Sequence, residues 1–467
     1  MKVSELYIKK YHQFEDFKLN LTYPQGHKFA GKPLNKVCFI GQSGTGKTTL
    51  LELLKEFIKG TTDFFNMGNI QSMALDLPKN YGSLVCLEIL YENKEVEIIF
   101  DNTSMSELSE YYVLIDEPID TEFYILYPNF KLFNYPSDIE LPKEGKKSKN
   151  NESQSANEYI DQIPQRAGRI ERKKESIREL NVIDFEDYDI NQIWQTINEA
   201  IIEDRELEIK KSLEISKILR NPKVLKDVLD KATDEFRKWR EETPNPIQDL
   251  ADNYLDKIIG RFNLKVKTEL DFEKKEDIET IKIQQKNGKE IPFEALSTGT
   301  KQVILTALPL YGLKPKDSII LFDEPERSLY PDIQTEIVDF YTSMAENSQF
   351  FFATHSPLVA ASFEPWEIIE LKFNEETGNV EQELYYDIEK GRHVDNYTIY
   401  PQYLTYDGIL KRVFDMKKEP NSLRMNELVK LATLESQLKH NNLSPEAKKE
   451  KFEEIIKLAD QLDWDLK

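Results

Sequence analysis

The sequence predicts an α/β fold that is split by a helical insertion and completed by a helical C-terminal appendage. Three observations support this prediction. An apolar run at residues 37–40 leads through a glycine-rich loop into a helix with one apolar face. Residues 190–240 are rich in Glu, Lys, Leu and Ile at helical spacing, and residues 391–467 are again mostly helical in pattern.

Composition and charge limit the kind of protein this can be. The chain has 467 residues, of which 39% are hydrophobic and 31% are charged, enough for a large core and an accessory domain. The formal net charge of −22 argues against a surface that binds nucleic acid throughout, because phosphate contacts need clustered Lys and Arg. Any contact with DNA is therefore expected to be local.

The cysteines and the hydropathy pattern indicate the compartment. Cys38 and Cys86 each lie in an apolar strand-like run, and no metal-ligand spacing joins them to the five histidines. The N-terminus has no apolar core of signal-peptide length, and no later run approaches the roughly 20 apolar residues of a membrane helix. We expect a soluble protein of the reducing cytoplasm that does not contact a membrane.

The first predicted region, residues 1–142, contains alternating apolar and polar positions at 6–8 and 17–21 that indicate strands. Two further strand-like runs, 83–90 and 95–100, are separated by four polar or aromatic residues and predict a hairpin. This region includes the glycine-rich loop and the helix after it, so it forms the N-terminal lobe of the predicted fold.

The second region, residues 143–262, combines a basic linker with the helical insertion. Lysines and arginines cluster between Lys143 and Lys174, around a Ser/Asn-rich stretch that indicates an exposed segment. Two interpretations stay open for it, a solvated charged loop or a local contact with DNA. The helical pattern that follows is interrupted at Asn221-Pro222, which predicts an antiparallel helical hairpin with Pro222 in the first turn of its second helix.

The third region, residues 263–390, returns to strand patterns and forms the predicted C-terminal lobe. Strands are expected at 264–270 and 280–284, and Asn287-Gly288 marks a hairpin turn. Residues 391–467 then form the predicted helical tail.

The glycine-rich loop carries the strongest chemical signal. Residues 41–48 match the phosphate-binding pattern GxxxxGK[ST] between a strand and a helix, a context that rules against an incidental glycine turn. Backbone amides can wrap phosphates, the Lys47 ammonium can reach the β and γ phosphates, and the Thr48 hydroxyl can bind Mg²⁺. The expected nucleotide contacts are Gly41, Gln42, Ser43, Gly44, Thr45, Gly46, Lys47, Thr48 and Thr49.

A second apolar run ends in two acids, Asp323 and Glu324. A buried strand of this kind delivers carboxylates to a site at its C-terminal edge. Asp323 is expected to hold Mg²⁺ through water, and Glu324 is the natural general base for the attacking water. Alone, such a pair is more often a solvated strand end. Together with a phosphate-binding loop it predicts a catalytic site.

Two further segments complete the predicted site. Leu296-Ser-Thr-Gly-Thr-Lys-Gln302 begins a predicted helix about 20 residues before the acidic pair and resembles the LSGGQ signature of ABC ATPases, with Thr in place of the first Gly. This resemblance implies that Ser297 and the Gly299 amide donate to a γ-phosphate bound by another subunit. His355 ends the apolar run 350–353 and is predicted to contact the γ-phosphate or the attacking water. Read in isolation, a Ser-capped helix and a structural histidine would be the more frequent explanations.

The four motifs together resemble ABC-type ATPases of the SMC, RecF and OLD-nuclease kind, over residues 1–140 and 263–375. The resemblance is closest at Asp323-Glu-Pro-Glu-Arg-Ser-Leu-Tyr-Pro331 and Ala353-Thr-His-Ser-Pro357, although the family often has His where this chain has Tyr330. It implies a head domain that binds ATP and Mg²⁺ between two subunits. Lys47, Glu324 and His355 would be catalytic, and Ser297 and Gly299 would complete the partner's site. The active unit would be a dimer or a larger oligomer.

The long separation of the phosphate loop from Ser297, about 250 residues, indicates a head split by an insertion. In this the chain resembles the stand-alone ATPase subunits of bacterial anti-phage systems such as Septu and PARIS. The only Asp-x-Asp of the tail is Asp463-Trp-Asp465, at its far end, so no nuclease is visible and the effector is expected to be a separate protein. The alternative is a RecF- or SMC-like repair ATPase that clamps DNA, and a transporter ATPase ranks third.

Overall fold

The structure is a computed structural model of the 467-residue chain. It describes residues 2–67, 84–91, 94–101, 110–115, 132–137, 182–185, 207–220, 226–242, 245–269, 282–383, 385–387, 392–394, 400–414, 422–440 and 444–462. These divide into two compact units, residues 1–404 and 405–467. Each unit is described separately below.

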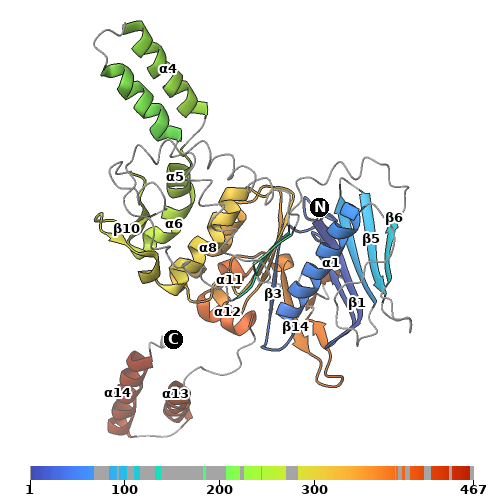
Figure 1. The fold of residues 1–467 in the computed structure, drawn as a ribbon. Helices are drawn as coiled ribbons and strands as arrows, with labels where there is room; N and C mark the ends of the chain where they lie inside the picture. Colours follow the sequence, from blue (N-terminus) through green and yellow to red (C-terminus); the bar gives the residue numbers. More distant parts are fainter. Residues whose placement is uncertain are drawn as a thin grey trace. The chain divides into compact units, whose positions relative to one another are not determined.

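One mixed sheet forms the framework of the first unit (Figure 1). Among the described residues it holds twelve strands in the order β6-β5-β4-β1-β2-β15-β14-β3-β13-β12-β7-β8. Their bounds are β1 Lys2–Tyr11, β2 Phe14–Asn20, β3 Lys36–Gly41, β4 Leu84–Tyr91, β5 Lys94–Asp101, β6 Glu110–Ile115, β7 Leu132–Tyr135, β8 Val182–Asp184, β12 Ile319–Asp323, β13 Gln349–Ala353, β14 Ile368–Phe373 and β15 Val380–Gln382.

The central strands β14, β3, β13, β12, β7 and β8 are parallel to one another. Strands of this kind are covered on both faces, which explains the continuous apolar runs in the sequence. The register pairs Asp323 with Ala353 and Ala353 with Phe39. It therefore brings the residues that follow β3, β12 and β13 to the same edge of the sheet.

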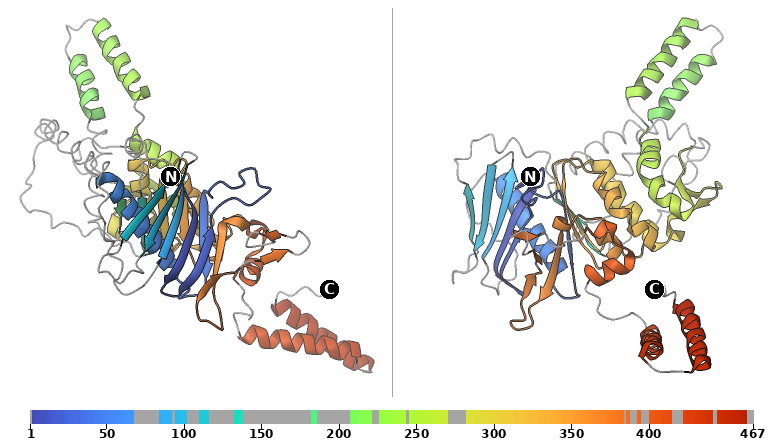
Figure 2. Two further views of the ribbon diagram at one scale, coloured as in Figure 1. Left: turned by 90° about the vertical axis from the view of Figure 1, so that its right-hand side faces the viewer. Right: turned by 180° about the vertical axis from the view of Figure 1, so that it is seen from behind.

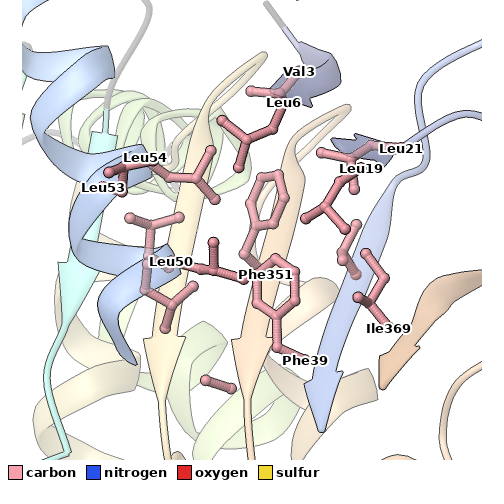
Figure 3. Close-up of a cluster of buried hydrophobic side chains, with 14 of the residues drawn as sticks. Val3, Leu6, Leu19, Leu21, Phe39, Leu50, Leu53, Leu54, Phe351 and Ile369 are labelled. Carbon is pink, nitrogen blue, oxygen red and sulfur yellow. The ribbon is translucent and has the colours of Figure 1, made fainter. Parts of the chain in front are cut away.

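Helix α1 (Lys47–Met67) lies against one face of these central strands. Leu50 and Leu54 belong to a buried cluster that also contains Phe39 and Phe351 from the central strands and Leu6 from β1. Figure 3 shows the side chains of this cluster meeting between α1 and the strands. Because α1 begins at the phosphate loop, this packing holds the loop at the edge of the sheet.

The opposite face carries a stack of aromatic rings. Phe322 stacks on Tyr135, Tyr341 and Phe352, with ring centroids 4.9, 4.7 and 5.0 Å apart. The Tyr135 hydroxyl donates to the carbonyl of Thr306 in helix α8 (Thr298–Leu313), and Tyr341 lies on α10 (Ile337–Thr342). Helices α1 and α8 thus cover different faces of the central sheet. The short helices α9 (Pro331–Gln334) and α11 (Pro357–Ala360) follow β12 and β13.

The insertion contains a pair of helices, residues 207–219 and α4 (Lys226–Glu242), that lie side by side in both views of Figure 2. Contacts at the base of the pair make it antiparallel: Arg240 pairs with Glu208, and the Lys211 ammonium lies 5.2 Å from the Trp239 ring centroid. The chain continues through α5 (Pro246–Asp249), η2 (Leu250–Leu255), α6 (Asp256–Ile259) and η3 (Gly260–Phe262). A small antiparallel sheet follows, of β9 (Leu264–Val266), β10 (Ile283–Gln285) and β11 (Glu290–Ile291).

The remaining elements of the first unit are η4 (Phe293–Ala295), η5 (Pro365–Glu367), η6 (Pro401–Tyr403) and the pair β16 (Tyr385–Asp387) and β17 (Arg392–Val394). The second unit contains α12 (Tyr406–Arg412), α13 (Ser422–His440) and α14 (Pro445–Leu462). Leu431 and Leu434 of α13 pack with Ile455, Leu458 and Leu462 of α14. None of the helices in the described ranges is long and apolar enough to cross a membrane.

The predicted α/β fold is confirmed, and the structure adds that its central sheet is large and mainly parallel around β3. The hairpin of β4 and β5 is present, and so is the turn at Asn287-Gly288, where Gly288 has φ 88°. Within the described residues, the strands expected at 264–270 and 280–284 cover Leu264–Val266 and Ile283–Gln285, and residues 270–281 are not described. The basic segment Lys143–Lys174, Pro222 and Asp463-Trp-Asp465 lie outside the described residues.

Candidate nucleotide-binding site

The phosphate-binding loop lies between β3 and α1, where the sequence predicts it. Gly41, Gly44 and Gly46 have φ values of 144°, 86° and 87°, which L-residues rarely adopt. Thr45 closes the turn, because its N–H and its hydroxyl both donate to the Gln42 carbonyl. Lys47 opens the helix, so the free N–H groups of its first turn face the loop.

Close packing explains why two of these positions need glycine. A Cβ at Gly41 would lie 2.4 Å from the carbonyl oxygen of Leu371 in β14. A Cβ at Gly46 would lie 2.2 Å from Nε2 of Gln13, in the turn between β1 and β2, and 2.7 Å from the ring of Phe14, the first residue of β2. The loop is therefore held between β14 and the β1–β2 turn.

Lys47 is buried and its ammonium donates to the carbonyls of Gly41 and Gln42, each at 3.2 Å. Burial lowers the pKa of Lys47, and the negative charges of Asp323 and Glu324 oppose that shift. The Lys47 ammonium therefore lies inside the phosphate loop. It can bind phosphate oxygens there.

Thr48 and Asp323 bring two oxygen ligands together at the edge of the sheet. The Thr48 hydroxyl donates to Asp323 Oδ2 over 3.0 Å. Burial raises the pKa of Asp323 to about 6, so the carboxylate charge lacks full solvation. Hard oxygen donors and an undersolvated carboxylate fit Mg²⁺, which binds proteins through one or two such ligands. These two residues would hold the ion.

Glu324 and His355 face each other beyond this pair. His355 Nε2 lies 3.9 Å from Glu324 Oε1, and the two side chains are 41% and 37% exposed, so water reaches both. Glu324 has φ 46°, a left-handed conformation stabilised by its N–H, which donates to the Ala353 carbonyl over 2.8 Å. Burial and the charge of Lys47 lower the pKa of His355, and the charge of Glu324 opposes this shift. The lowered pKa favours a neutral imidazole.

Ser297 and Gly299 lie at the start of α8, on the other face of the central sheet. Ser297 caps the helix by accepting a hydrogen bond from the Thr300 N–H. A Cβ at Gly299 would lie 2.4 Å from the carbonyl oxygen of Ser328, so α8 begins directly against the loop that follows the acidic pair. Tyr330, at the end of this loop, is 67% exposed. The structure thus brings Lys47, Thr48, Asp323, Glu324 and His355 together, but the contacts described for Ser297 and Gly299 are with other residues.

Sequence reasoning missed four residues that shape this site. Gln13 and Phe14 back the phosphate loop, and Glu326 and Thr354 form a buried hydrogen bond behind Glu324 and His355. Glu326 is the second Glu of the Asp-Glu-Pro-Glu motif, but no local sequence pattern indicates that its side chain is buried. Gln13 and Phe14 carry no motif at all.

A buried strand β3, a phosphate-binding loop at a helix start and paired acids at the end of the parallel strand β12, which is separated from β3 by β13, define a phosphate-loop nucleotide-binding protein. The family model described as an AAA ATPase domain matches residues 1–360. The chain therefore belongs to the AAA ATPase domain family.

Other comparisons found no curated relative but several similar structures. No curated protein matches the chain. The SMC head domain from Thermotoga maritima is 12% identical, with a TM-score of 0.37, over 82% of this chain and 98% of that one. An Smc head domain with an extended coiled coil, bound to the C-terminal domain of ScpA and derived from Pyrococcus furiosus, is 14% identical, with a TM-score of 0.37, over 84% and 97%. The family membership rests on the match to residues 1–360.

Proposed function

We propose that this protein binds MgATP at the phosphate loop and hydrolyses it with Glu324 as general base. The observation that carries the proposal is the meeting of Lys47, Thr48, Asp323, Glu324 and His355 at one edge of the parallel sheet. Mg²⁺, when bound by Thr48 and Asp323, neutralises charge on the phosphates. Glu324 is exposed enough to take a proton from water, and a neutral His355 can orient that water.

We further propose that the complete site is formed by two copies of the chain. Ser297 and Gly299 begin a helix on the face of the sheet opposite to α1. A helix start with free N–H groups binds anions, so this one would serve a nucleotide held by another subunit. The exposed Tyr330 beside it would belong to the same contact surface. The active unit is then at least a dimer.

The biological role that we propose is that of an ATPase sensor or scaffold in a bacterial anti-phage complex, in which nucleotide state controls a separate effector. Two features support it: the head is split by a short helical hairpin, and a compact helical unit follows the head. We propose that the effector binds at one of these two features. A repair ATPase that clamps DNA is the competing outcome of the tests below.

Hydrolysis and assembly are tested together with Glu324→Gln, which keeps the size of the side chain but removes the base. The variant should bind MgATP normally, lose turnover by roughly 100-fold or more, and accumulate as a dimer. Phosphate release and light scattering would measure this, with Glu346→Gln, an exposed acid in the turn before β13, as the control. Unchanged turnover in Glu324→Gln would remove Glu324 as base.

The cellular role is tested by purifying the tagged protein from cells that also express its neighbouring genes, with and without ATP. A co-purifying nuclease or toxin would support the defence complex and identify the effector. A bare dimer that gains mass only when DNA is added would replace that proposal with the DNA-clamping one.

A further inference from the structure

A buried carboxyl group lies directly behind the two catalytic candidates. Glu326 follows Glu324 by two residues and is only 8% exposed. Its Oε1 accepts a hydrogen bond from the hydroxyl of Thr354, which is fully buried, and the backbone amides of Glu326 and His355 also stabilise the carboxylate. Within the described part of the chain, no hydrogen bond is made to the buried Oε2. Carboxyl groups are rarely buried so completely unless they are paired, because desolvation is costly. The arrangement therefore calls for a functional explanation.

The hydrogen bond to Thr354 is one link of a closed ring. The Ser356 N–H donates to Thr354 Oγ1 over 2.8 Å, and the Ser356 hydroxyl donates to Gln334 Oε1 over 2.6 Å. Gln334 Nε2 then donates to the Leu329 carbonyl over 2.9 Å, and the Leu329 N–H donates to the Glu326 carbonyl over 3.0 Å. The ring joins the loop after β12 to the loop after β13 through buried or half-buried groups.

His355 lies between two members of this ring, Thr354 and Ser356. Its backbone is consequently held on both sides, while its imidazole points to Glu324. The Thr354 N–H also donates to the Phe39 carbonyl over 3.1 Å, which ties the same loop to β3. We propose that Glu326 is a positioning residue that, through Thr354, fixes His355 at the distance from Glu324 that hydrolysis requires. This inference rests on the proposed ATPase function.

The ring also reaches the start of α8. Leu329 and Ser328 are the residues that a Cβ at Gly299 would strike, at 3.0 Å from Leu329 Cδ2 and 2.4 Å from the Ser328 carbonyl oxygen. A movement of the start of α8 would therefore displace Leu329, which belongs to the hydrogen-bonded ring that contains Glu326. Glu326 lies between the element that we expect to meet the partner subunit and the pair that we expect to activate water.

The surroundings of Glu326 decide which variants are informative. Burial raises the pKa of Glu326 to about 7, and the Thr354 hydrogen bond opposes this shift. The neighbouring ionisable groups are Glu324 and the buried thiol of Cys38. Glutamine copies the protonated acid and keeps an acceptor for Thr354, whereas leucine fills the space without one. Glu326→Gln is therefore the conservative variant and Glu326→Leu the disruptive one.

The test compares kcat and KM for ATP in the wild type, Glu326→Leu, Thr354→Val and the double variant. We expect each single change to lower kcat by about 10- to 100-fold, the effect of misplacing a catalytic group by around 1 Å, with KM changed less than about threefold. The double variant should be no worse than either single one, because both remove the same hydrogen bond. Glu326→Gln and Thr354→Ser should recover most of the loss.

The matched control is Glu367→Leu, which removes another buried carboxyl group, 4% exposed, in η5 at the start of β14. It should lower the unfolding temperature but leave kcat near the wild-type value. If Glu326→Leu does not fold, the comparison of Thr354→Val with Thr354→Ser tests the same hydrogen bond. Full kcat in the folded disruptive variants, or an equal loss in Glu367→Leu, would overturn the positioning role. A wild type without ATPase activity would instead overturn the proposed function.

Discussion

The packing of the phosphate loop against the β1–β2 turn can be tested by one added methyl group. Gly46 has φ 87°, and a Cβ at this position would lie 2.2 Å from Gln13 Nε2 and 2.7 Å from Phe14 Cζ. The Gln13 side chain can move aside. Phe14 is fully buried in the core that includes α1, so its ring cannot move without disturbing its neighbours. Gly46→Ala therefore combines backbone strain with overpacking.

The two contributions can be sized separately. A left-handed conformation costs an L-residue about 1–2 kcal/mol, and an extra methyl group in a packed core costs about 1–3 kcal/mol. We expect Gly46→Ala to lower the free energy of unfolding by about 2–5 kcal/mol. Gly378 is the matched control, because it has φ 74° but no atom of a described residue lies within 4 Å of an added Cβ. Gly378→Ala should cost only the first contribution.

Denaturant titration of the two variants measures the difference, and calorimetric titration with MgATP measures its functional effect. Gly46→Ala should be less stable than Gly378→Ala by about 1–3 kcal/mol, the overpacking contribution. It should also bind MgATP more weakly, because the loop must shift to relieve the contact with Phe14. Equal destabilisation of the two variants would refute the close approach of the β1–β2 turn to the loop.

Two further predictions concern buried charges outside the nucleotide site. Lys55 Nζ lies 3.0 Å from Asp184 Oδ2, and both side chains are buried. Lys55→Met should lower the free energy of unfolding by about 3–5 kcal/mol, because it leaves the buried charge of Asp184 uncompensated. Most of this loss should be recovered in the double variant Lys55→Met/Asp184→Leu. A cost below about 1 kcal/mol in denaturant titration would contradict this pairing. Burial raises the pKa of Glu367 from 4.5 to about 7, so the folded chain binds the proton more tightly and stability should fall by up to about 3 kcal/mol as pH rises from 5 to 8. Glu367→Gln should flatten that part of the stability–pH curve, and an unchanged slope would show that Glu367 is not its source.

Local signals account for what the sequence predicts well. The apolar run at 37–40, the glycine pattern and the helical face beginning at Leu50 lie next to one another in the chain, so they predict β3, the phosphate loop and α1 together. The acids after β12 were predicted by the same logic, because a parallel strand delivers its last residues to a known edge.

The features that the sequence does not predict depend on contacts between segments that are distant in the chain. Thr354 and Glu326 are 28 residues apart, and they meet only because the register aligns Asp323 with Ala353. The approach of Gln13 to Gly46 likewise follows from the placement of the β1–β2 turn, which no local pattern encodes. The alternation that predicts strands at 264–270 and 280–284 does not indicate which of those residues pair, and the described pairing of β9 with β10 joins 264–266 to 283–285.

The described segments that precede and follow the helical hairpin in the sequence each contact a helix of the candidate nucleotide site. On one side, β8 is tied to α1 by the Asp184–Lys55 ion pair. On the other, α5 and η2 are tied to α8: the Tyr311 hydroxyl donates to Asp249 Oδ2 over 2.8 Å, and the Tyr254 and Tyr311 rings meet at 5.4 Å. The segments that flank the hairpin therefore contact both the helix that starts at the phosphate loop and the helix that starts at Ser297. Each half of the candidate nucleotide site thus has its own contact with a segment that flanks the hairpin.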